Sequence, residues 1–165
     1  MSYFLFGTFN EIYNKEKLQR IKEYGKEKDI YIWFNQEITF YNDIQRMMRE
    51  QKAEGNTLFA ITSKNQPSNS SDVLFPFDKV PNKLLFIDES RMFYKKCCRE
   101  NIDVLFDFLE KLISMFNIEY IEIFVVEGYD DIFQRKVCNI DEVKRDLLYQ
   151  IEERVSIDSS IYYVR

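Results

Sequence analysis

The pattern of apolar and polar positions along this chain predicts a series of strands and helices. Alternating or short apolar runs at Ser2–Phe9, Ile30–Phe34 and Thr57–Thr62 predict β-strands. Ile30–Phe34 is apolar throughout, which favours a central place in a sheet. Three more strands are expected at Lys83–Ile87, Ile118–Glu127 and Ser160–Val164.

Four helices are expected between these strands. A polar helix with a thin apolar stripe follows the capping residue Asn14 and extends to about Lys28. A second helix runs from a Thr39 cap to Gly55. The strongest three-four spacing covers Asn101–Phe116, with Asn101 as the cap or with an earlier start near Ser90. The last helix, Ile140–Arg154, follows Asn139 and Glu142, which are placed as in a capping box.

Together these elements predict one α+β domain over residues 1–165. We expect a mixed, mainly antiparallel sheet of about five to six strands, with about four helices packed on it. Residues 63–82 are expected to form an irregular, partly mobile connection, because Ser, Asn and Gln are frequent there and Pro76 and Pro81 interrupt the pattern.

Nothing in the composition indicates a secreted or membrane protein. The apolar start lacks the basic residues and cleavage site of a signal peptide, and the longest later apolar run, Ile121–Val126, is too short to span a bilayer. Cys97, Cys98 and Cys138 form no disulfide or zinc pattern. We therefore expect a cytoplasmic protein with reduced, ordinary thiols.

The net charge of −5 is unevenly distributed along the chain. Residues 1–115 hold 17 acidic and 17 basic side chains, whereas residues 116–165 hold 11 acidic and 6 basic ones. The acidic excess argues against nucleic acid as a ligand and favours a basic protein partner. The alternative interpretation of the acidic segment 118–131 is a solvated strand end and turn.

A basic stripe is expected if residues 90–100 are helical. Arg91, Lys95 and Arg99 then lie on one face at four-residue steps. They are expected to pair with neighbouring acids rather than to bind phosphate.

The absence of histidine narrows the possible chemistry more than any motif does. It removes Ser-His and Cys-His nucleophilic systems and most zinc hydrolase sites. The four glycines, Gly7, Gly25, Gly55 and Gly128, are too scattered for a phosphate-binding loop. We therefore predict a protein that is not an enzyme, with no catalytic residues, metal site or cofactor.

One short segment nevertheless resembles a catalytic motif. Val125–Asp131 is similar to the first motif of the Toprim fold, in which an apolar strand leads into a glutamate and a glycine beside a magnesium site. That resemblance implies a metal-dependent nuclease centred on Glu127. The later Asp-x-Asp of the family is missing, since only Asp158 follows at the corresponding place.

In size, acidity, aromatic content and α+β build, the chain as a whole resembles bacterial toxin-immunity proteins. This resemblance implies an inhibitor that occludes the basic active site of a toxin domain, such as a nuclease. The expected contact residues are Glu119, Glu122, Glu127, Tyr129, Asp130, Asp131 and Phe133. The alternatives are a non-catalytic subunit of a larger, phage-type assembly and the carboxylate-dependent nuclease.

Overall fold

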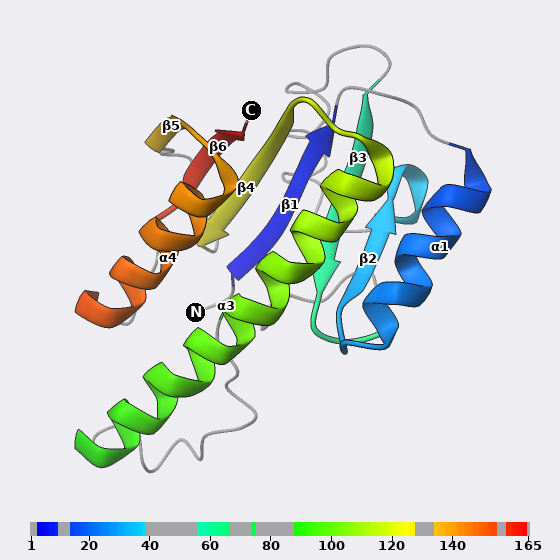
Figure 1. Cartoon of the computed structure of the whole chain (residues 1–165). Coiled ribbons are helices and arrows are strands. Elements are labelled where there is room, and N and C mark those ends of the chain that lie inside the picture. The colour runs from blue at the N-terminus through cyan, green and yellow to red at the C-terminus, as the bar shows by residue number, and fades with distance from the viewer. Residues whose placement is uncertain are drawn as a thin grey trace.

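The computed structural model describes residues 3–9, 14–38, 56–66, 74, 88–127, 134–154 and 158–164 (Figure 1). The strands are β1 (Tyr3–Phe9), β2 (Tyr31–Phe34), β3 (Thr57–Thr62), β4 (Ile121–Glu127), β5 (Gln134–Cys138) and β6 (Ser160–Val164). The helices are α1 (Lys15–Lys26), α3 (Asp88–Phe116) and α4 (Ile140–Arg154), with a 3₁₀ turn, η1, at Asn35–Glu37.

The six strands form one sheet in the order β2-β3-β1-β4-β6-β5. Every neighbouring pair is antiparallel except β5 and β6, which are parallel and are joined by α4. This confirms the mixed, mainly antiparallel α+β sheet. Of the four expected helices, three are described; the one expected from Thr39 to Gly55 lies outside the described residues, as does the strand expected at Lys83–Ile87.

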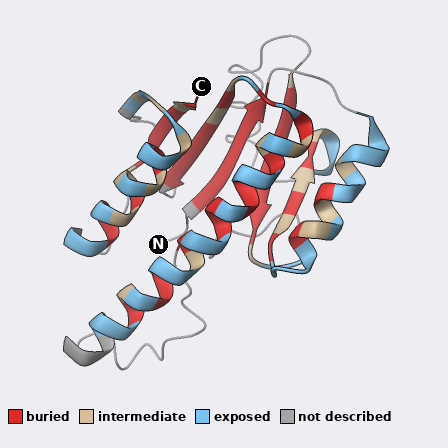
Figure 2. Cartoon of the chain, in the orientation of Figure 1, coloured by how far each residue is buried: buried red, intermediate tan, exposed pale blue. Residues whose placement is uncertain are grey.

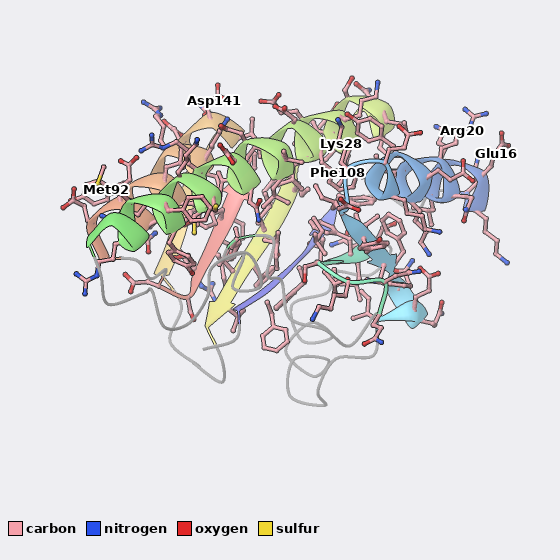
Figure 3. The ribbon with its side chains drawn as sticks, turned by 90° about the horizontal axis from the view of Figure 1, so that it is seen from below. Glu16, Arg20, Lys28, Met92, Phe108 and Asp141 are labelled. Atoms are coloured by element: carbon pink, nitrogen blue, oxygen red, sulfur yellow. The ribbon has the colours of Figure 1, made fainter. Side chains whose placement is uncertain are left out.

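The three helices cover one face of the sheet. α3 crosses the middle, α1 lies beside β2, and α4 lies over β5 and β6 (Figure 1); the view from below shows all three on the same side (Figure 3). The side chains of β1 divide between two apolar clusters. Leu5 and Phe9 face the helices, whereas Phe4 and Phe6 belong to the cluster on the opposite face. Both faces of the central strands are therefore buried (Figure 2).

The centre of the helix-side core is a group of phenylalanine rings. The Phe9 ring lies 5.9 Å from Phe59 and 5.7 Å from Phe116, both roughly stacked, and meets Phe34 edge-on at 6.5 Å. This one side chain of β1 thus links β2, β3 and the end of α3. At the junction of α1 and α3, labelled at Phe108 in Figure 3, Tyr24 stacks on Phe108 at 6.0 Å.

Gly7 permits the close approach of β1 to its neighbours. A Cβ placed there would lie 2.0 Å from the carbonyl oxygen of Glu122 and 2.6 Å from the Phe59 ring. Neither neighbour has room to move, because one is backbone of the adjacent strand and the other is a fully buried ring.

Local sequence signals account well for the helix ends. The Asn14 side chain accepts a hydrogen bond from the Lys17 amide at 2.9 Å, as a helix cap should. Asn139 and Glu142 form the predicted capping box, with reciprocal hydrogen bonds of 2.9 Å. Both α4 and β6 have the predicted bounds.

Four sequence-based expectations are corrected. Ile30–Phe34 was expected to lie centrally, yet β2 is an edge strand; it is apolar because α1 packs along it, leaving Ile32 2% and Phe34 3% exposed. Asn101 lies inside α3 rather than capping it, because burial continues back through Cys98 and Tyr94 and the helix begins at Asp88, near the earlier of the two predicted starts.

The third correction is β5, a strand that was not expected. Its sequence, Gln-Arg-Lys-Val-Cys, lacks apolar alternation because it is an edge strand with little buried surface. β4 also begins at Ile121, three residues later than expected. Within the expected irregular stretch 63–82, residues 63–66 form a bend, and apart from residue 74 the rest lies outside the described residues.

We predict that Gly7→Ala destabilises the protein strongly. The new methyl group would force β1 away from the backbone of β4, and overpacking of this kind costs about 1–3 kcal/mol or more. Urea unfolding followed by circular dichroism measures the change. Val137→Ala on exposed β5 is the control, with an expected change below about 0.5 kcal/mol; equal stability of the two variants would contradict the close packing at Gly7.

Candidate interaction surface

The structure describes three of the predicted acidic residues. Glu119 is exposed and precedes β4, Glu122 is half-buried within β4, and Glu127 ends the strand. At a strand rise of roughly 3.3 Å per residue, the backbones of Glu122 and Glu127 lie about 16 Å apart. The other predicted contact residues, Tyr129, Asp130, Asp131 and Phe133, lie outside the described residues.

Glu122 occupies the sheet face opposite the helices. Ile121 and Ile123 belong to the helix-side core, whereas Phe124 belongs to the other cluster, so strand alternation places Glu122 on the side of Phe124. Its cross-strand neighbours are Thr8 on β1 and Tyr163 on β6. A charged side chain thus stands at the end of a face that is otherwise largely apolar.

Two tyrosines surround this carboxylate. The Tyr120 hydroxyl donates to Glu122 Oε1 at 3.1 Å, and the Tyr120 ring stacks on Tyr163 with centroids 6.2 Å apart. Tyr120, Glu122 and Tyr163 are all partly exposed. We call these three residues the Glu122 site.

The second carboxylate oxygen of Glu122, Oε2, differs from the first in its hydrogen bonding. Oε2 is buried and accepts no hydrogen bond from any described residue. Leaving a buried acceptor unsatisfied costs about 1–3 kcal/mol, and more for a charged group. Within the described part of the chain, it is the only buried side-chain oxygen or nitrogen in this condition.

β5 borders the Glu122 site. Val137 pairs with Tyr163 in the sheet and is 71% exposed. Lys136 contacts α4, so alternation places Arg135 and Val137 on the opposite face, the one that carries the Glu122 site. A carboxylate flanked by aromatic rings and an aliphatic rim is chemically suited to receive an ammonium or guanidinium group.

The densest polar network lies on the helix side of the same three elements. Asp146 Oδ2 on α4 accepts from Lys136 Nζ at 2.6 Å, the Tyr162 hydroxyl at 2.7 Å and Gln150 Nε2 at 3.1 Å. Gln150 Oε1 in turn accepts from the Asp158 amide at 2.8 Å. Each of these polar groups has a hydrogen-bond partner. The network is therefore a structural link between β5, α4 and β6 rather than a site with an open donor or acceptor.

The charges of this network are set by those contacts. Burial alone would raise the pKa of the Asp146 carboxyl, but the hydrogen bonds from Lys136 and Tyr162 and the Lys136 charge hold that pKa below its usual range. Burial and the hydrogen bond to Asp146 raise the pKa of the Tyr162 hydroxyl. Asp146 therefore stays ionised and Tyr162 stays protonated at neutral pH.

Sequence reasoning missed a second acidic cluster, on α3. Its four exposed members follow the helix at three- and four-residue steps: Glu100, Asp103, Asp107 and Glu110. Asp103 pairs with Lys144 on α4 at 2.7 Å. That hydrogen bond raises the pKa of the Lys144 ammonium, against the effect of burial, and the charges of Asp103, Asp107 and Glu110 add to it. The helical spacing was the available signal.

The basic stripe on α3 is used within the fold. Arg99 forms an ion pair with Glu152, and Lys95 donates to the Glu152 carbonyl near the end of α4. The contact of Arg99 agrees with the expected pairing to an acid, whereas Lys95 bonds to a main-chain carbonyl.

Two further features are a buried thiol and a surface groove. Burial is the main cause that raises the pKa of the Cys98 thiol to about 12, which leaves it protonated and unreactive. A surface groove of about 420 Å³ separates α1 from η1, but its best-placed cation, Lys22, is paired with Glu37. Among the described residues, no three His, Cys, Asp or Glu side chains are arranged to hold a metal ion.

No helix in the described ranges is long and apolar enough to cross a membrane. No family model matches the chain, and neither a curated protein nor a solved structure does.

We predict that Asp146→Asn lowers the free energy of unfolding by about 1–3 kcal/mol at pH 7, the range for hydrogen bonds to charged groups. Because the folded-state pKa of Asp146 is depressed, its contribution is complete above the unfolded-state value of about 4 and is lost as pH falls further. Urea unfolding at pH 7 and near pH 3 should therefore show the two proteins converging in acid. A constant difference would contradict the role of the charge. Asp141→Asn, an exposed acid on the same helix, is the matched control.

Proposed function

We propose that this protein binds a basic protein partner and acts as an inhibitor of the immunity type, covering the active site of a toxin domain. The observation that carries the proposal is the buried Glu122 Oε2, for which the described residues supply no hydrogen-bond donor. A lysine or arginine side chain of the partner would supply the missing donor and would lie beside the tyrosine rings.

The Glu122 carboxylate differs from the exposed acidic side chains in the free energy that its burial costs the fold. Asp107 and Glu110 are exposed, so water solvates them at no expense to the fold. One oxygen of Glu122 is buried without a donor among the described residues, while the other accepts from Tyr120, and an unsatisfied buried polar atom calls for an explanation. The Glu122 site is therefore the better candidate for the contact.

The surroundings of Glu122 favour a protein over a small ligand. Tyr120 and Tyr163 are partly exposed, and tyrosine is the residue type most often found at the centre of binding interfaces, with Trp and Arg. Val137 extends the apolar area to the sheet edge. The net charge of −5 would speed the encounter with a basic partner.

Access to the carboxylate requires only a small movement. The terminal torsion of a glutamate is soft, so the carboxylate can turn while Tyr120 keeps one hydrogen bond. A cation entering beside the partly exposed Tyr120 and Tyr163 rings then meets the second oxygen.

The partner can be sought directly with tagged protein in lysate from the native host at moderate salt, followed by mass spectrometry. One basic protein in stoichiometric amount supports the proposal. A multi-component complex would point instead to the assembly subunit, and a protein recovered alone would count against both.

We predict that Glu122→Gln has opposite effects on stability and binding. Burying a neutral amide costs less than burying a carboxylate, so the free energy of unfolding should stay constant or rise by about 1–3 kcal/mol. Affinity for the recovered partner should fall about tenfold or more, since the charge-assisted bond is lost. Urea unfolding and calorimetric titration measure the two effects.

Glu27→Gln, at the exposed end of α1, removes the same charge far from the site and should change neither quantity. If Glu122→Gln lowered stability and left binding intact, Glu122 would be a structural residue and the proposed contact would be wrong.

A further inference from the structure

The two edges of the sheet are treated differently by the fold. At β2, α1 packs along the strand, and the outward Phe34 amide donates to the Glu37 carboxylate at 2.9 Å. Ile32 and Phe34 are almost completely buried. One main-chain amide of this edge is therefore already satisfied by a side chain of the same chain.

β5 forms the opposite edge of the sheet among the described strands. It pairs with β6, and no other described strand lies beside it. In a parallel pair, alternate residues direct their N–H and C=O groups away from the neighbour, so part of the β5 backbone is directed outward. Arg135 and Val137 are exposed on the face of the Glu122 site.

Side chains on the helix side of the sheet hold β5 in place. Lys136 is anchored to Asp146, which is bonded in turn to Tyr162 and Gln150, and the Lys136 ammonium lies 5.6 Å from the Tyr162 ring centroid. A strand that is already ordered loses little further conformational freedom when another strand pairs with it.

We propose that β5 accepts an extended segment of the partner protein as a seventh strand. The chemistry of the edge specifies this segment: an acidic residue opposite Arg135 and an apolar residue two positions away, opposite Val137. The added strand borders the face that carries the Glu122 site, so one partner can contact both.

A second copy of this chain fits the edge poorly. Antiparallel pairing of two β5 strands about their centres would bring Lys136 opposite Lys136 and place both Arg135 side chains in the same interface. The inference rests on the proposed function only in taking a protein as the occupant.

The test uses the full chain and two labelled threonine-rich peptides, one with a glutamate and a valine two positions apart and one with a lysine in place of the glutamate. Amide chemical shifts and hydrogen exchange of β5 report binding even when it is weak. We expect the glutamate peptide to protect β5 amides and to bind at least about tenfold more tightly than the lysine peptide, because Arg135 attracts one and repels the other.

Arg135→Glu should reverse this preference, and Val137→Ala should weaken binding of both peptides, because it removes apolar contact without adding a charge. Lys26→Glu on exposed α1 makes the same charge change elsewhere and should alter nothing. Failure of both peptides to protect β5 would overturn the proposal, and so would a dimer in sedimentation experiments with β5 protected, since the occupant would then be a second copy.

Glu122→Gln separates this inference from the proposed function. It should leave peptide binding at β5 unchanged, because the peptides do not reach the carboxylate. Peptide binding without any basic partner would leave the edge site standing while removing the inhibitor function.

Discussion

The close pairing of β1 with β4 is the constraint on which the rest of the fold depends. β1 lies between β3 and β4 in the sheet, and it buries side chains on both faces. Gly7 lets the two backbones and the Phe59 ring meet without a gap. The same close contact fixes the position of β4, and with it the position of Glu122, relative to β1.

The order of charged residues along α3 is explained by the contacts of α3 with α4. Described basic side chains gather in the first half of α3 and acidic ones in the next turns. The antiparallel helix α4 presents the complementary charges. Lys95 and Arg99 meet the end of α4 at Glu152, and Asp103 meets Lys144 nearer its start. The helix pair is therefore matched electrostatically, and its register is set by two ion pairs.

How far the sequence predicts this structure depends on how local the signal is. α4 and β6 were predicted to the residue because a capping box and strong periodicity mark them. The edge position of β2 could not be predicted, because its apolar run looks the same under a covering helix as in the middle of a sheet. β5 was not predicted because its position depends on contacts between residues distant in sequence. Arg135 pairs with β6, and Lys136 contacts Asp146 on α4.

The candidate site, too, was predictable only in the part whose signal is local in the sequence. Acidity and position suggested Glu122, but the donor-less oxygen depends on Tyr120 and on strands that meet only in the fold. A folded domain keeps only about 5–15 kcal/mol of net stability, so one unsatisfied buried carboxylate oxygen is a noticeable fraction of the whole. The Asp146 network on the other face of the same strands is fully satisfied, which shows that this part of the fold can pair its buried polar groups when pairing is structural. The contrast between the two carboxylates, one complete and one incomplete, is what favours a functional role for Glu122.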